Sequence, residues 1–123
     1  MDLIKLYNSI SKLLFGKKIF TFIICWRAPY FSSITPLITE LTPETLQVVV
    51  KLRRNVKNHL GTMHAIAMCN ACELAAGVFL EANLPKAKRW IPKAMQVEYL
   101  QKATTDITAA VAYSALCQAL TNG

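Results

Sequence analysis

Apolar residues recur at helical spacing in the first third of the chain. Across residues 3–14 they lie three and four positions apart with polar residues between them, which predicts an amphipathic helix ending at Gly16. A second apolar segment, residues 19–26, stops before a proline and predicts another short helix. We therefore expect residues 1–31 to form a helical cover on a domain made by residues 32–123.

Strand-like patterns follow in four segments. Branched apolar residues in segments 34–41 and 46–52 flank Thr42-Pro43-Glu44, which predicts two strands joined by a turn. Segments 90–100 and 107–113 are rich in aromatic and small apolar residues and predict two more strands.

Between these pairs of strands lies the most apolar part of the sequence. Residues 63–81 predict about five turns of helix, and only Asn70 and Glu73 are polar between residues 65 and 80. A helix that is apolar on nearly every side is expected to be buried on nearly every side. The fold class that follows is α+β, with an antiparallel sheet wrapped around a long buried central helix.

The composition is that of one compact domain. The 123 residues are 54% hydrophobic and 17% charged, which excludes disordered and low-complexity classes. The longest apolar stretch is shorter than the roughly 20 residues needed to cross a bilayer, so no transmembrane protein is expected.

Charge adds a preference for anionic partners. The chain has 14 Lys and Arg against 7 Asp and Glu, a net charge of +7, which attracts anions. Because the basic residues are scattered rather than gathered with aromatics on one face, no nucleic-acid partner is expected. Residues 1–31 carry five basic side chains against Asp2 alone, so a membrane-surface anchor or an organellar targeting segment is the alternative to a packed cover.

The four cysteines form no disulfide framework. Cys69 and Cys72 lie one turn apart in the apolar helix, and no second pair accompanies them. We expect buried, reduced thiols in a cytoplasmic protein and no metal site.

Glu73 is the most informative residue, because a carboxylate inside an apolar helix is costly unless it is paired, hydrogen-bonded or used. Asn70 and Gly77 lie three positions before it and four after it, so we expect one face that combines polar groups with open space. The alternative is a structural role, in which Glu73 bonds a backbone donor or a basic partner inside the fold.

Residues 58–64 form the loop that enters this helix. Thr62 is the expected N-cap, which leaves backbone N–H groups pointing outward at a helix start that can bind an anion or an oxyanion. Asn58 and His64 add side-chain donors, or serve only to hold the loop and the cap. His64 and Glu73 are nine residues apart, about 13 Å on opposite sides of one helix. A shared site would therefore need the helix start of a second subunit, which predicts a dimer.

These residues resemble a known superfamily. Asn58-x-x-Gly61-x-x-His64, followed by the acid Glu73, resembles the signature of phenylacetate-pathway-type acyl-CoA thioesterases of the hotdog fold. Other segments resemble an uncharacterised bacterial hotdog family related to a thioesterase-like domain that is fused to an acetyltransferase. These segments are residues 27–31, 58–67, 73–77 and 90–93. The resemblance extends over about residues 7–113 and implies a homodimer or tetramer.

The resemblance implies hydrolysis of an acyl-CoA thioester, with coenzyme A as part of the substrate and no separate cofactor. Glu73 would activate water or attack the carbonyl directly, and Asn58 would position the water or the carbonyl. Backbone N–H groups near His64 and Ala65 would hold the oxyanion. The residues expected to contact the substrate are Gly61, Thr62, Ala65, Asn70, Arg53 and Arg54. The candidates for the coenzyme A phosphates are Arg53, Arg54, Lys86, Lys88 and Arg89, and the alternative for each of them is a solvated surface charge.

Two departures from the family pattern favour a second reading. Ala65 and Ile66 stand where many active relatives have glycines, and their side chains narrow the backbone approach. Residues 114–120 do not alternate like the further strand that the family fold needs, so we expect either a shortened sheet or a helix over its edge. A noncatalytic acyl-binding or assembly module is therefore the alternative function.

Overall fold

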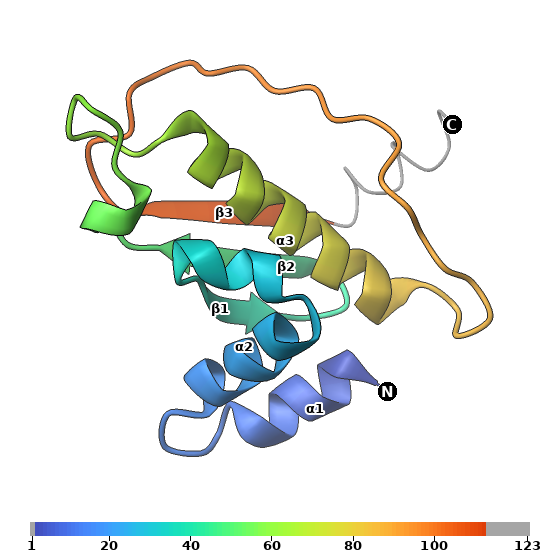
Figure 1. Ribbon diagram of the computed structural model, residues 1–123. Helices are drawn as coiled ribbons and strands as arrows, with labels where there is room; N and C mark the ends of the chain where they lie inside the picture. The colour runs from blue at the N-terminus through green and yellow to red at the C-terminus, as the bar shows by residue number, and fades with distance from the viewer. Residues whose placement is uncertain (1, 113–123) are drawn as a thin grey trace.

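The computed structural model describes residues 2–112, which form a mixed α+β architecture (Figure 1). The described residues hold a three-stranded antiparallel sheet in the order β1-β2-β3 and a central helix, α3. The expectations for residues 113–123 lie outside this range. In chain order the elements are α1 (Leu3–Ile10), α2 (Gly16–Arg27), the 3-10 helix η1 (Pro29–Ile34), β1 (Leu37–Leu41), β2 (Thr45–Val50), the 3-10 helix η2 (Arg54–Val56), α3 (Ala65–Asn83) and β3 (Ile107–Ala112).

The two N-terminal helices are present, but their boundary differs from the prediction. The first helix ends at Ile10, and Gly16 begins α2 rather than ending α1. A Cβ on Gly16 would lie 1.8 Å from the carbonyl oxygen of Ile10, so only glycine lets α2 start so close to the end of α1. Leu3 and Phe20 of these helices join the same buried core as the sheet and α3.

The predicted hairpin is confirmed. β1 and β2 pair antiparallel, and the Thr42 hydroxyl accepts hydrogen bonds from the backbone N–H groups of Glu44 and Thr45 at 3.2 and 3.0 Å. These bonds add to the backbone hydrogen bond at the reversal, in which the Thr42 N–H donates to the Thr45 carbonyl at 2.8 Å. Ile34 and Leu52 are exceptions, since Ile34 belongs to η1 and Leu52 lies beyond the end of β2 at Val50.

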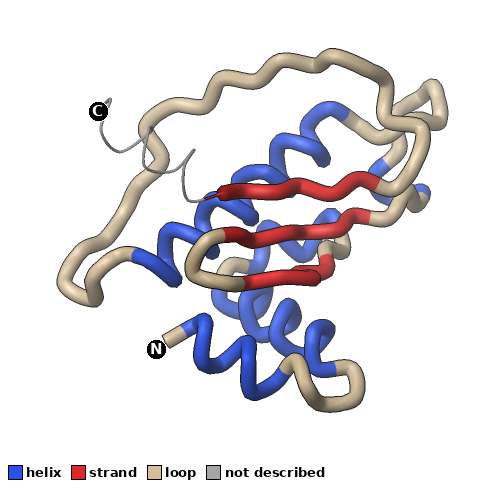
Figure 2. Tube along the Cα trace, turned by 180° about the vertical axis from the view of Figure 1, so that it is seen from behind, coloured by secondary structure: helices blue, strands red, loops and turns tan. Residues whose placement is uncertain are grey.

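The core lies between the sheet and α3. Every second residue of β2 is buried on the face that meets α3, as the period of a half-buried strand requires. β3 confirms the strand expected near residues 107–113 and pairs antiparallel with β2, Ala109 opposite Val48. Figures 1 and 2 show the sheet on one side of α3 only, with α1 and α2 beyond the β1 edge.

The strand expected over residues 90–100 is absent. Residues 84–106, the arching segment, run past the side of α3 that faces away from the sheet before entering β3 (Figure 1). Residues 91–100 are all exposed and make no backbone–backbone hydrogen bond with the rest of residues 2–112. Aromatic and branched residues favour a strand only when a neighbouring strand supplies the ladder, and no strand within residues 2–112 pairs with this segment.

The central helix is less enclosed than its composition suggests. Eight of its 19 residues are buried, whereas Ile66 and Cys72 are exposed and Glu73 is half-buried. The expectation of burial on nearly every side is wrong, because the sheet covers one side and the arching segment only partly covers the other. By length and composition α3 could cross a membrane, but the buried core helices of folded domains share this composition.

Candidate functional site

The loop before α3 is organised by Asn58. Its side-chain oxygen accepts from the backbone N–H groups of Leu60 and Thr62 at 2.9 and 3.1 Å. Its amide nitrogen donates to the Thr62 hydroxyl at 2.8 Å. Gly61 adopts a φ of +79°, the left-handed region that the tight turn requires. The Asn58-x-x-Gly61 spacing therefore builds this turn, and one Asn58 amide hydrogen remains for another partner.

His64, and not the expected Thr62, caps α3. Its Nδ1 accepts from the backbone N–H of Ile66 at 3.0 Å, while Thr62 is engaged in the Asn58 turn. In the neutral ring the proton then lies on Nε2, at the exposed side of the residue.

One backbone N–H remains at the start of α3. The His64 N–H donates to the carbonyl of Val56 at 2.7 Å, so it is not part of the expected oxyanion pair. Ile66 donates to the His64 ring. Ala65 N–H has no hydrogen-bond acceptor among the described residues, and Ala65 lines an open cavity of about 370 Å³, the helix-start cavity. Asn58 and Thr62 line it too, opposite Tyr99 of the arching segment.

Glu73 lies in the wall of a larger hollow. This hollow, the Glu73 cleft, has a volume of about 840 Å³ and separates α3 from the arching segment. Its apolar lining includes Leu80, Leu84 and Met95. Three basic side chains also line it, Lys88, Arg89 and Lys93. The cleft thus combines one carboxylate and three cationic side chains with an apolar lining.

The open space expected beside Gly77 is filled. The indole ring of Trp90 packs on the Gly77 backbone, and a Cβ there would lie 2.9 Å from the ring. Trp90 Nε1 donates to a carboxylate oxygen of Glu81 at 3.2 Å. Gly77 therefore makes room for a side chain of the same protein, and that side chain closes one end of the cleft.

Asn70 does not share the environment of Glu73. It is 7% exposed and donates at 3.4 Å to the hydroxyl of Ser33 in η1, while its side-chain oxygen has no partner among the described residues. Asn70 lines neither the Glu73 cleft nor the helix-start cavity. The structure places it between α3 and η1.

The two halves of the expected site are separate within one chain. Glu73 lines the Glu73 cleft, Asn58 and Ala65 line the helix-start cavity, and no residue lines both. The separation follows from the period of the helix, because nine residues at about 100° each place His64 and Glu73 on opposite sides of α3.

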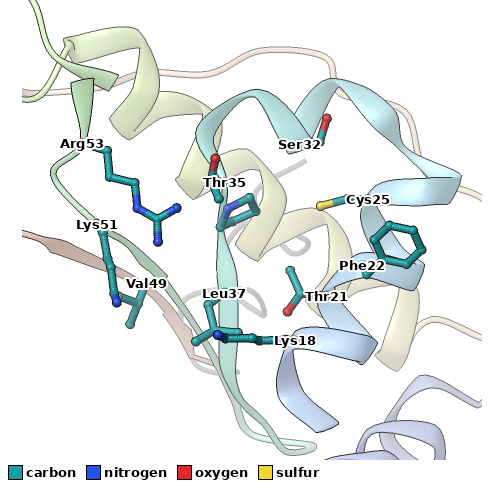
Figure 3. Close-up of a pocket in the computed structure, with 11 residues that line it drawn as sticks. Lys18, Thr21, Phe22, Cys25, Ser32, Thr35, Leu37, Val49, Lys51 and Arg53 are labelled. Carbon is teal, nitrogen blue, oxygen red and sulfur yellow. The ribbon is translucent and has the colours of Figure 1, made fainter. Parts of the chain in front are cut away.

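The two arginines also separate. Arg53 lines a third cavity of about 390 Å³ beside α2, and Lys18 and Lys51 line the same cavity (Figure 3). Arg54 lies exposed in η2 and does not line this cavity. The sequence offered no signal that Lys18, from the N-terminal helices, would line the same cavity as residues that follow β2.

A thiol and a phenol that sequence reasoning did not connect lie together. Cys69 Sγ and Tyr99 OH are 2.8 Å apart, and this contact raises the pKa of Tyr99. Desolvation, with a smaller effect from Cys69, raises the pKa of Cys72, so the thiol form is favoured. No group of three or more His, Cys, Asp or Glu residues suited to a metal ion occurs within residues 2–112.

Two comparisons with known proteins each match most of the chain. The family model described as "Domain of unknown function (DUF4442)" matches residues 16–121. The chain is also similar to a solved structure described as "Crystal Structure of genomics APC5556", with 44% sequence identity and a TM-score of 0.78, over 92% of this chain and 76% of that one. No curated protein sequence matches the chain.

Proposed function

The chain belongs to the DUF4442 family, and from the chemistry around α3 we propose that it is a homodimeric acyl-CoA thioesterase of hotdog type. The observation that carries this proposal is Glu73 in the wall of an apolar cleft of about 840 Å³ with three cations around it. An acyl chain suits the apolar lining, and the basic side chains suit the phosphates of coenzyme A. Glu73 lines the same cleft as both groups of residues.

The reaction needs a base and an oxyanion donor. Glu73 removes a proton from water, the water oxygen attacks the thioester carbonyl, and the tetrahedral intermediate expels coenzyme A thiolate, which takes up the proton. Direct attack by Glu73 would instead form a mixed anhydride that water then cleaves. In both routes the Ala65 N–H, at the positive end of α3, stabilises the negative charge on the carbonyl oxygen.

A second subunit completes the site in this proposal. Glu73 and the Ala65 N–H line different cavities of one chain, so the carbonyl must lie between Glu73 of one protomer and the helix start of its partner. The arching segment supports such an assembly, because its exposed side chains include Ile91, Tyr99 and Leu100. The backbone of residues 91–100, which pairs with no other backbone within residues 2–112, is suited to strand pairing with a second copy.

Thiol release from a panel of short, long and aromatic acyl-CoA substrates tests the proposal. We expect turnover by the parent protein, loss of turnover in Glu73→Gln, and parent-like turnover in Glu44→Gln, which changes an exposed turn residue in the same way. Retained turnover in Glu73→Gln would show that Glu73 is not the base or the nucleophile.

A noncatalytic acyl-binding module is the second candidate, and one observation favours it. Ile66, which stands where many active relatives have a glycine, carries an apolar side chain that is 59% exposed at the start of α3. This function predicts acyl-CoA binding without hydrolysis by the folded, dimeric protein. Binding titrations on the same substrate panel separate the two candidates.

A further inference from the structure

The outer face of α2 carries apolar side chains that nothing in residues 2–112 covers. Leu14, in the turn before α2, is 83% exposed, and Trp26 is 76% exposed. The stripe begins in this turn and continues along one side of α2. Its members are Leu13, Leu14, Phe15, Ile19, Phe22 and Trp26. Phe22 and Trp26 stack on each other with ring centroids 6.4 Å apart. A monomeric surface seldom exposes so continuous an apolar stripe without a partner.

Basic side chains border this stripe. Lys12, Lys17 and Lys18 are exposed around the turn that joins α1 to α2, and the Lys18 ammonium lies 5.5 Å from the centre of the Phe15 ring. Apolar and aromatic side chains flanked by lysines are typical of segments that rest in the interface of an anionic bilayer.

The cavity beside α2, here the α2 cavity, adjoins the same stripe. Phe22 belongs to both, and the cavity reaches from there to Leu37 and Val49 on the sheet face opposite α3. Figure 3 shows the charged ends of Lys18 and Arg53 directed into this space, with Lys51 beside them. No acidic side chain is among the described residues that line it. Three cations around an apolar floor are complementary to a phosphate joined to an aliphatic chain.

We propose that α2 docks the protein on an anionic phospholipid surface, with the stripe in the interface and a lipid phosphate in the α2 cavity. The proposal is independent of the thioesterase function. It commits to a lipid rather than a second protein copy, because a second copy would bring the same cations against each other around a two-fold axis. Residues 1–31 cannot simply be deleted as a test, since Leu3, Phe20 and Ile24 belong to the core.

Vesicle co-sedimentation of the full chain tests this docking. We expect binding to phosphatidylcholine vesicles that contain about one third phosphatidylglycerol, no binding to phosphatidylcholine alone, and weakening by salt. Lys18→Gln and Arg53→Gln should each weaken binding about fivefold, whereas Lys102→Gln, an exposed lysine on the arching segment, should not. Trp26→Ser should also weaken binding, and a blue shift of tryptophan emission on vesicles should disappear in Trp26→Phe.

Four outcomes would overturn the proposal. One is equal binding to both kinds of vesicle. Another is vesicle binding that Lys18→Gln and Arg53→Gln leave unchanged while circular dichroism shows both variants folded. The third is dimerisation that Trp26→Ser abolishes in the absence of lipid, which would assign the stripe to a second copy. The fourth is saturable binding of inorganic phosphate by both the parent and Trp26→Ser, while neither protein binds vesicles. That result would assign the α2 cavity to free phosphate.

Discussion

The indole ring of Trp90 rests on the backbone of Gly77, so that a Cβ on Gly77 would lie 2.9 Å from two ring carbons. This contact joins the arching segment to α3 and closes one end of the Glu73 cleft. The sequence suggested that Gly77 leaves room for a ligand, but the space beside it is occupied by Trp90.

Gly77→Ala should displace Trp90 and open this end of the cleft. Overpacking of this kind costs about 1–3 kcal/mol, which urea unfolding measures, and the emission of Trp90 should shift to the red as the ring becomes solvated. The double variant Gly77→Ala/Trp90→Ala is the control. It should be no less stable than Trp90→Ala alone, and a further loss in the double variant would place the clash elsewhere.

Ala65→Pro should remove the proposed oxyanion donor without unfolding α3. Proline is tolerated at the first position of a helix, and the preceding His64 already has the extended conformation that proline requires, with φ −62° and ψ 136°. We expect thiol release to fall by about 10²–10³ with the helix content unchanged. Ala65→Ser keeps the N–H and should keep activity, so equal activity in the two variants would exclude this N–H from catalysis.

Two inactive variants should complement each other if the site lies between subunits. Ala65→Pro and Glu73→Gln refolded together at equal concentration give half mixed dimers, each with one intact site. We therefore expect roughly a quarter of the parent activity per chain. A mixture as inactive as its components would place the whole site within one protomer.

Cys72 should react slowly with alkylating reagents at neutral pH although it is exposed. Desolvation and the neighbouring Cys69 raise its pKa, so less of the reactive thiolate is present below that pKa than in an ordinary cysteine. The rate of iodoacetamide labelling at Cys72, followed by mass spectrometry, should rise with a midpoint above the ordinary thiol pKa. Cys69→Ser should move this midpoint down, and a midpoint at or below the ordinary value in the parent would contradict the assignment.

Local patterns predicted much of the fold because they depend only on neighbours along the chain. Helical spacing located α1, α2 and α3, alternation located β1 and β2, and Thr42 marked the turn between them. The expected capping residue is wrong because Thr is a preferred N-cap type, whereas His is not. Only the loop geometry, in which Asn58 engages Thr62, leaves His64 as the cap.

The chemistry of the site depended on contacts between distant segments. The sequence by itself determined that Glu73 and the helix start lie on opposite sides of one helix, since the period of the helix decides it. Only the tertiary structure decided that Trp90 fills the space at Gly77 and that Lys18 and Arg53 line the same cavity. Residues 90–100 show the physical reason most clearly. Their composition favours a strand, but a strand exists only where another backbone accepts its hydrogen bonds, and no pattern within the segment itself contains that partner.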